Sequence, residues 1–373
     1  MNDVMGIIFS DDKTCTIDKL SNVRSLSALP FGGRYRIIDF MLSSFANSQV
    51  HNVGVTTQYK YHSLMDHISS GRPWDLERKT QGLFLLPPNL MKEISITGDR
   101  NNINILKGVE SYVEHSRQKY VILAEASLIC NIDFKELYHF HIDSGADVSI
   151  MYFRDVDNTI GYRGLDEVEV DDEGNVVDIF TSPRMNRSQY KFMKIIMMSK
   201  ELMSELVDEA YAHKKVCNVI DYIGEKLNTL NVKGMEYRHY VRLIHDVHTY
   251  FNCNMEMLDH DIREEVFRGK NKIMTKVNDN SPTRHMPGSE CVNSLIANGC
   301  RLSGRVENSI LFRNVVVEEG ATVKNSIIMQ DSVIGKGSVV QNVIIDKDCV
   351  LGEKKHLIGQ PNYPFVIAKG ETV

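Results

Sequence analysis

The chain has 373 residues, of which 42% are hydrophobic and 25% are charged, and its formal net charge is −6. This length allows two domains with their own cores, and the weakly acidic balance excludes a general electrostatic attraction to nucleic acid or anionic lipid. Seven scattered cysteines without a CxxC pair argue against a disulfide framework and a zinc site. No apolar run reaches the ~18 residues of a membrane span. These features predict a cytoplasmic protein whose anion sites are local clusters.

The first expected element is a buried strand over residues 5–9, followed by the loop Ser10-Asp11-Asp12-Lys13. A strand, a turn and a helix at the start of an α/β domain commonly form a phosphate-binding loop, in which glycines let the backbone approach the phosphate. This loop has no glycine, and two carboxylates stand there instead. We therefore expect a solvated turn.

Strand-like and helix-like segments alternate from residue 1 to about residue 270. The β-rich runs are residues 52–57, 120–124 and 147–152, and a helical pattern covers residues 134–144. Ser199 is a suitable N-cap for another helix, whose apolar stripe comprises Leu202, Met203, Leu206, Val207, Ala210 and Tyr211. This alternation predicts an α/β domain over residues 1–270, with a mixed, mostly parallel sheet of Rossmann-like type. Ligands of such sheets bind outside the carboxyl ends of the strands, where Ser10 and Glu125 are expected.

After about residue 290, aliphatic residues recur every six positions. One series is Leu311, Val317, Val323 and Met329, and the other is Ile327, Val333, Val339, Ile345 and Leu351. Asn308, Asn325 and Asn342 recur at intervals of 17 residues. Three hexads make one triangular coil, so the pattern predicts a hexapeptide β-helix in which each coil buries the aliphatic face of the next. We assign residues 291–373 to a C-terminal left-handed parallel β-helix and residues 271–290 to a linker.

The most specific segment is Pro30-Phe-Gly-Gly-Arg-Tyr-Arg-Ile-Ile-Asp-Phe40. It resembles the signature of the glucose-1-phosphate adenylyltransferases (ADP-glucose pyrophosphorylases), bacterial enzymes that activate glucose for glycogen. The resemblance continues in chain order through residues 47–48, 53–59, 67–68, 71–78, 86–88, 145–149 and 254–257 and the hexapeptide region. It implies a nucleotidyltransferase domain followed by a left-handed β-helix, assembled as a tetramer. Catalytic members join glucose 1-phosphate to the adenylyl group of ATP with Mg²⁺.

The resemblance also identifies the positions that serve adenylyl transfer in catalytic members. The glycine-rich loop aligns with Ser10, Asp11 and Asp12, the lysine before Phe-Gly-Gly with Leu26, the two metal-holding aspartates with Ser127 and Leu243, and the sugar-phosphate lysine with Ser182. None of these residues supplies the cations or metal ligands that the reaction needs. We therefore expect no catalytic residues, metal or cofactor in this chain, and Mg²⁺ and ATP at a catalytic partner.

The pattern is most similar to the second, regulatory subunit of the bacterial two-subunit enzyme of glycogen biosynthesis. Such a chain is expected to form a heterotetramer with the catalytic subunit, or a homo-oligomer in its absence. The resemblance predicts an effector site for a sugar phosphate or phosphate, built from the arginines Arg24, Arg34, Arg36, Arg305 and Arg313 through charge-assisted hydrogen bonds. The chain departs from the family at Pro30, where a basic residue or histidine is usual.

Two other functions stay open from the sequence. An active nucleotidyltransferase with relocated metal ligands would use Glu125 and Asp246, and a stand-alone sensor would bind a sugar phosphate or nucleotide without an enzymatic partner. The run that contains His239, His245 and His248 has no regular metal-ligand spacing. An acyltransferase with a histidine base is excluded, because residues 295–351 contain no histidine.

Overall fold

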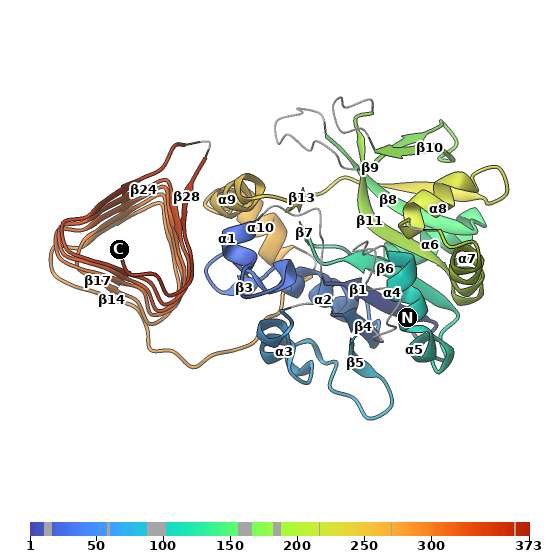
Figure 1. Cartoon of the computed structure of the whole chain (residues 1–373), viewed down its shortest axis with the longest axis horizontal. Coiled ribbons are helices and arrows are strands. Elements are labelled where there is room, and N and C mark those ends of the chain that lie inside the picture. Colours follow the sequence, from blue (N-terminus) through green and yellow to red (C-terminus); the bar gives the residue numbers. More distant parts are fainter. Residues whose placement is uncertain are drawn as a thin grey trace. The chain divides into compact units, whose positions relative to one another are not determined.

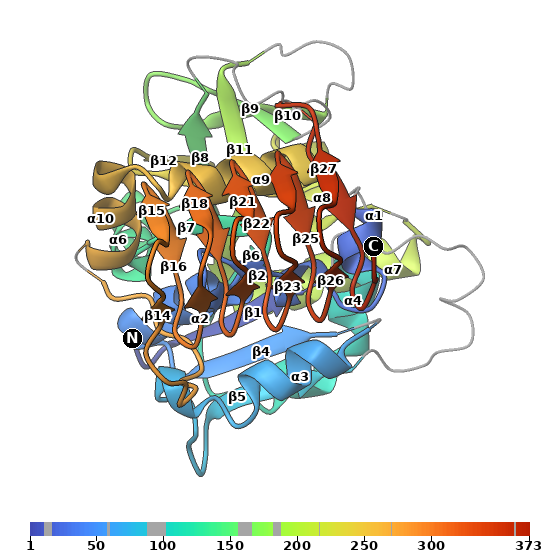
Figure 2. The same ribbon diagram turned by 90° about the vertical axis from the view of Figure 1, so that its left-hand side faces the viewer.

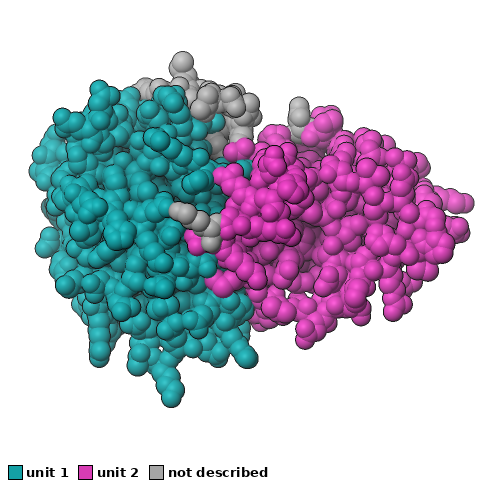
Figure 3. Space-filling view, turned by 180° about the vertical axis from the view of Figure 1, so that it is seen from behind, with its two compact units in different colours: residues 1–13, 41–59, 69–241 teal, residues 14–40, 60–68, 242–373 magenta. Residues whose placement is uncertain are grey.

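In a computed structural model the chain folds into two compact units, which Figure 3 shows in teal and magenta. Unit 1 comprises residues 1–13, 41–59 and 69–241, and unit 2 comprises residues 14–40, 60–68 and 242–373. The structure describes residues 1–10, 17–57, 60–87, 102–155, 166–181, 188–215, 217–269, 271–361 and 363–373. Unit 2 therefore combines the C-terminal region with two short segments from the first fifth of the sequence.

Unit 1 is built on a nine-stranded mixed sheet with the main path β10-β9-β11-β6-β1-β4-β5, to which β8 and β12 are added beside β11. Its strands are β1 (Val4–Phe9), β4 (Asn52–Thr56), β5 (Gly82–Leu86), β6 (Tyr120–Glu125), β8 (Val148–Arg154), β9 (Asp166–Val170), β10 (Val176–Thr181), β11 (Tyr190–Ser199) and β12 (Val232–Tyr237). Strand β7 (Leu128–Cys130) follows β6. The mixed α/β sheet is confirmed. Parallel pairing joins β6, β1, β4 and β5, whereas β11 runs antiparallel to β6, β8 and β9.

The predicted elements of unit 1 are confirmed. The predicted runs correspond to β4, β6 and β8, and the helical pattern to α6. The helices are α2 (Ile38–Asn47), α4 (Asn102–Gly108), α5 (Glu110–Glu114), α6 (Phe134–Ser144), α7 (Lys200–Ala212), α8 (Val219–Glu225) and the 3₁₀ helix η2 (Arg72–Trp74). Ser199 caps α7, because its Oγ accepts a hydrogen bond from the Leu202 backbone N–H at 3.1 Å. Tyr211 was wrongly predicted as core: it is 37% exposed, and its ring lies 5.9 Å from Lys107 Nζ at the surface.

The C-terminal part of unit 2 is a parallel β-helix, as predicted. Figure 1 looks down its triangular coils, and Figure 2 shows them stacked. Three five-stranded sheets form its faces. The first contains β14 (Arg284–His285), β17 (Arg301–Leu302), β20 (Val316–Val317), β23 (Val333–Ile334) and β26 (Val350–Leu351). The second contains β15 (Glu290–Val292), β18 (Arg305–Glu307), β21 (Thr322–Lys324), β24 (Val339–Gln341) and β27 (His356–Ile358). The third contains β16 (Leu295–Ile296), β19 (Ile310–Leu311), β22 (Ile327–Ile328), β25 (Val343–Ile345) and β28 (Phe365–Ile367).

The interior of the β-helix confirms one aliphatic series and corrects the other. Leu311, Val317, Val323 and Met329 are fully buried. In the second series Val333 and Val339 are only half-buried, and their neighbours Ile334 and Val340 fill the core. Paired strands are offset by 17 residues, as Val339 is with His356. Two sides of six residues and one of five give this offset, so a strict count of six is out by one residue until the shorter side restores it.

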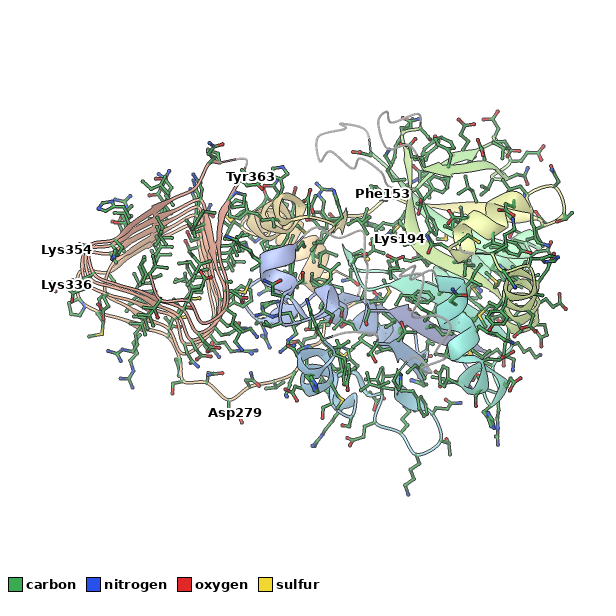
Figure 4. The ribbon with its side chains drawn as sticks, viewed as in Figure 1. Phe153, Lys194, Asp279, Lys336, Lys354 and Tyr363 are labelled. Carbon is green, nitrogen blue, oxygen red and sulfur yellow. The ribbon has the colours of Figure 1, made fainter. Side chains whose placement is uncertain are left out.

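Each corner of the triangle places a residue in the left-handed backbone region. The three corners contain Asn308, Asn325 and Asn342 (φ 45°, 45° and 53°), Asn314, Asp331 and Asp348 (φ 60°, 61° and 59°), and Gly320, Gly337 and Lys354 (φ 72°, 68° and 54°). Asn and Asp tolerate this conformation because their short polar side chains hydrogen-bond locally. Figure 4 marks the third corner by Lys336 and Lys354. The same corner is therefore revisited every 17 residues.

The rest of unit 2 surrounds a short hairpin. Its elements are α1 (Asp18–Ser21), the 3₁₀ helix η1 (Leu26–Ala28), β2 (Pro30–Phe31), β3 (Tyr35–Arg36), α3 (His62–Ile68), α9 (Val247–Glu256) and α10 (His260–Arg268). Strand β13 (Val241–Leu243) precedes α9. Among the described residues, no helix is long and apolar enough to cross a membrane.

Candidate anion-binding site

The two glycines of the signature segment form the tight turn between β2 and β3. Gly32 and Gly33 have φ values of +56° and +84°, which a side chain would strain. Helix α9 fixes this turn, because Asn254 Oδ1 accepts a hydrogen bond from the Gly32 N–H at 3.0 Å and the Tyr250 hydroxyl donates to the Pro30 carbonyl. The position of the arginines after the turn is thus set by residues more than 200 positions away in the sequence.

Arg36, the last residue of β3, is held by its neighbours in unit 2. Its backbone N–H donates to Asp39 Oδ2 at 2.9 Å, and its guanidinium donates to the hydroxyl of Ser63 at 2.9 Å. Asp39 Oδ1 also hydrogen-bonds to His67 Nε2. Burial lowers the pKa of Arg36 to about 10, against the opposing effect of Asp39, so the guanidinium stays charged at neutral pH. Burial also lowers the pKa of His67, which favours a neutral imidazole.

A cavity of about 260 Å³ lies within unit 2 and is rich in charged side chains. Its cations are Arg34, Arg36, Lys276, Arg313 and Lys347, and its carboxylates are Asp66, Asp331 and Asp348. Neutral polar groups come from His67, Asn278, Asn280, Asn314 and Gln330. Five cations against three carboxylates favour an anionic ligand, and arginine binds phosphate and carboxylate groups with paired hydrogen bonds. We call this the cation cavity.

One wall of the cation cavity is a single corner of the β-helix. Arg313, Gln330 and Lys347 lie 17 residues apart, the offset between successive coils. Gln330 Oε1 is buried without a hydrogen-bond partner in the described part of the chain. Burial, and then Arg36 and Arg24, lower the pKa of Lys347 to about 7. A ligand that accepts hydrogen bonds or carries negative charge would therefore stabilise the protonated amine of Lys347.

The five arginines predicted for an effector site fall into two groups. Arg34, Arg36 and Arg313 line the cation cavity together. Arg24 does not line it: this residue is 2% exposed and makes two hydrogen bonds, of 2.9 and 2.8 Å, with the buried carboxylate of Asp346. Arg305 is also elsewhere, exposed on β18 and paired with Glu307 at 3.2 Å. Sequence reasoning missed Lys276 and Lys347, although the 17-residue spacing from Arg313 pointed to the latter.

The positions aligned with the catalytic machinery hold no such groups where the structure describes them. Ser10, just after β1, is buried, and so are Leu26 in η1 and Leu243 at the end of β13. Ser127 is 2% exposed, and its Oγ has no hydrogen-bond partner among the described residues. Asp11, Asp12 and Ser182 lie outside the described residues. Two aliphatic and two hydroxyl side chains provide neither a cation for a phosphate nor a carboxylate for a metal.

The carboxylates considered as relocated metal ligands have other roles. Glu125 Oε2 accepts a hydrogen bond from Lys194 Nζ at 2.8 Å. Asp246 caps α9, accepting from the backbone N–H and the hydroxyl of Thr249 at 2.7 and 2.8 Å. Within the described parts of the chain, no group of three or more His, Cys, Asp or Glu side chains is arranged to hold a metal ion.

Comparison with known proteins relates both units to described families. Residues 17–230 match the nucleotidyl transferases, and residues 277–362 match the GlmU-like C-terminal hexapeptide family. The glycogen biosynthesis protein GlgD of Geobacillus stearothermophilus is 35% identical over 326 residues, which cover 86% of this chain and 83% of the relative. GlgD of Bacillus subtilis (strain 168) is 33% identical over 320 residues, covering 86% and 82%. The glucose-1-phosphate adenylyltransferase of Clostridium acetobutylicum is 29% identical over 322 residues, covering 84% and 83%.

Proposed function

The chain belongs to the GlgD family of nucleotidyl transferases, and on this premise we propose that it is a regulatory subunit of glucose-1-phosphate adenylyltransferase in glycogen biosynthesis. In this proposal it assembles with the catalytic subunit, as a heterotetramer in the cytoplasm, and modulates the synthesis of ADP-glucose from ATP and glucose 1-phosphate. The chain itself contributes a binding site for an anionic effector and no catalytic group.

The cation cavity is the observation that carries this proposal. Its arginines and lysines suit the phosphate of a sugar phosphate or inorganic phosphate. Its carboxylates and amides, including the buried Gln330 Oε1, suit the hydroxyl groups of a sugar. We propose that Arg34, Arg36 and Arg313, together with Lys276 and Lys347, form the effector site. Arg24 and Arg305 then belong to the supporting structure.

The residues at the expected metal positions support a non-catalytic role. Mg²⁺ takes oxygen ligands, chiefly carboxylates, phosphates and water. Ser127 supplies one hydroxyl and Leu243 supplies no ligand atom, so the described residues do not fit this metal. The proposal therefore places Mg²⁺ and ATP in the catalytic partner.

The last coil of the β-helix is the surface that we propose for contact with the catalytic subunit. Ile358 on β27, Tyr363 and Phe365 on β28 are 64%, 78% and 46% exposed, and Figure 4 labels Tyr363. Exposed apolar side chains beside an open strand edge are a feature that proteins usually cover. Ile358→Glu with Tyr363→Glu is expected to reduce co-purification with the catalytic subunit. Unchanged co-purification would place the contact elsewhere.

The experiment that tests the function compares ADP-glucose synthesis by this chain alone, by the catalytic paralogue alone, and by the two co-expressed. We expect a large gain in activity only in the mixture. Pyrophosphate production by the purified chain alone would instead establish an active enzyme. Ligand binding by the chain without a gain in the mixture and without co-purification would establish a stand-alone sensor.

A further inference from the structure

A polar cluster lies at the carboxyl ends of two adjacent strands in unit 1. Glu125 ends β6, which pairs in parallel with β1 so that Glu125 is opposite Phe9 and next to the start of Ser10. Ser127 follows two residues later, with a buried Oγ that has no partner in the described part of the chain. Lys194 reaches this edge from β11, which pairs with β6 on the other side. We call these four residues the strand-end cluster.

Lys194 adopts an unusual backbone conformation to reach the cluster. The register of β11 against β8 shifts between Phe192 and Ile196, and within this irregular stretch Lys194 has φ +56°. A lysine rarely adopts this left-handed conformation, which is sterically costly for residues other than glycine, asparagine and aspartate. Figure 4 labels Lys194 on its strand in unit 1. Such strain persists only where surrounding interactions maintain it, and it concentrates at functional sites.

The interaction that accompanies this strain is a largely buried ion pair. Lys194 Nζ lies 2.8 Å from Glu125 Oε2, and the two side chains are 11% and 16% exposed. A second cation that bound Glu125 would have to displace this ammonium and stay close to it. Two like charges in a poorly solvated place repel each other strongly. The chain's own lysine thus neutralises the one described carboxylate of the cluster.

We infer that the Lys194 ammonium occupies the place of a divalent cation at the carboxyl end of β6 and so closes the strand-end cluster to metal ions. The cluster is then a closed site that is kept in shape by an internal counter-ion. This inference goes beyond the regulatory role, since a chain with this ion pair could belong to a sensor or a subunit alike. It explains why a strained lysine is retained beside Glu125 and why the Ser127 hydroxyl is left without a partner.

Binding of Mn²⁺ to the full chain, measured by electron paramagnetic resonance, tests the inference. Lys194→Gly relieves the backbone strain and releases Glu125, so we expect Mn²⁺ to bind at least tenfold more tightly than to the wild type. Adding Glu125→Gln to this variant should return the affinity to the wild-type value. Lys215→Gly is the matched control, because it releases Glu225 from an exposed ion pair (side chains 43% and 50% exposed) and should change nothing.

A second variant covers the case in which Lys194→Gly fails to fold. Lys194→Asn keeps a residue that tolerates the left-handed backbone and also removes the ammonium, so it should show the same gain. Equal Mn²⁺ affinity in the wild type and in both Lys194 variants would overturn the inference. Glu125-dependent Mn²⁺ binding by the wild type would do so too. Neither result bears on the gain in synthesis from co-expression, so the two proposals fail separately.

Discussion

The ammonium of Lys194 in unit 1 and the guanidinium of Arg34 in unit 2 show two ways in which this chain treats positive charge. Lys194 is largely buried and faces Glu125, a partner supplied by the same sheet. Arg34 is exposed at the rim of a cavity in which five cations meet three carboxylates. The difference teaches that a cluster of charges is informative only when the chain's own counter-ions are counted. The first cluster is complete in itself, whereas the second lacks negative charge that a ligand can supply.

The largest effect is expected where an arginine of unit 2 is paired like Lys194. Arg24→Ala leaves the buried carboxylate of Asp346 without its partner, so the free energy of unfolding should fall by about 3–5 kcal/mol. Urea unfolding measures this loss. The matched control is Arg305→Ala, an exposed arginine of the β-helix, which should stay within about 0.5 kcal/mol of the wild type. A similar small loss for both variants would contradict a structural role for Arg24.

The opposite behaviour is expected of Arg34. Its replacement by alanine should change the free energy of unfolding by less than about 0.5 kcal/mol, because the side chain is exposed. Sulfate affinity, measured by calorimetry, should fall roughly 10- to 100-fold, because a hydrogen bond to a charged group contributes about 1.5–3 kcal/mol. Unchanged sulfate affinity would remove Arg34 from the site.

Asn254 connects the two kinds of residue, because it supports the turn that precedes Arg34. Asn254→Ala leaves the Gly32 N–H without its acceptor, and we expect a loss of about 1–3 kcal/mol in the free energy of unfolding. Sulfate affinity should fall as well, since the hairpin is no longer held by α9. Asn254→Asp retains an acceptor oxygen and should recover part of both losses. Thermal unfolding and calorimetry on the three proteins decide the matter, and full stability of Asn254→Ala would refute the positioning role.

The smallest effect expected is a pH dependence that comes from Lys347. This amine lies in the cation cavity near Arg36, Arg24, Asp346 and Lys369, and its pKa is lowered to about 7. A bound anion favours the protonated amine, so sulfate affinity should be highest below pH 7 and fall as the pH rises through about 7.

Sulfate stays a dianion over this range, and the lowered pKa of His67 keeps its imidazole neutral above pH 7. The fall in affinity between pH 6.5 and 8.5 should be about tenfold or less, because one pKa unit corresponds to 1.36 kcal/mol. Lys347→Met should bind sulfate weakly and with no such dependence. The same pH profile in wild type and variant would assign the titration to another group.

Sequence patterns reveal most where structure is repetitive and least where distant residues meet. The 17-residue spacing of Asn308, Asn325 and Asn342 marked the coils, because every coil repeats the same corner geometry. The same spacing relates Arg313 to Lys347, but unlike residue types concealed that wall of the cavity. The pairing of Arg24 with Asp346 spans 322 positions and has no local signal. The left-handed backbone of Lys194 could not be predicted either, because lysine gives no indication of that conformation.

The response of the co-purified complex to anions tests the central claim most directly. ADP-glucose synthesis would be measured with and without inorganic phosphate or glucose 6-phosphate, for complexes that contain the wild-type chain, the Arg34→Ala/Arg313→Ala double variant, or Arg305→Ala. We predict a response in the wild-type and Arg305→Ala complexes that is lost in the double variant, with assembly intact in all three. A full response from the double variant would contradict the assignment of the cation cavity as the effector site.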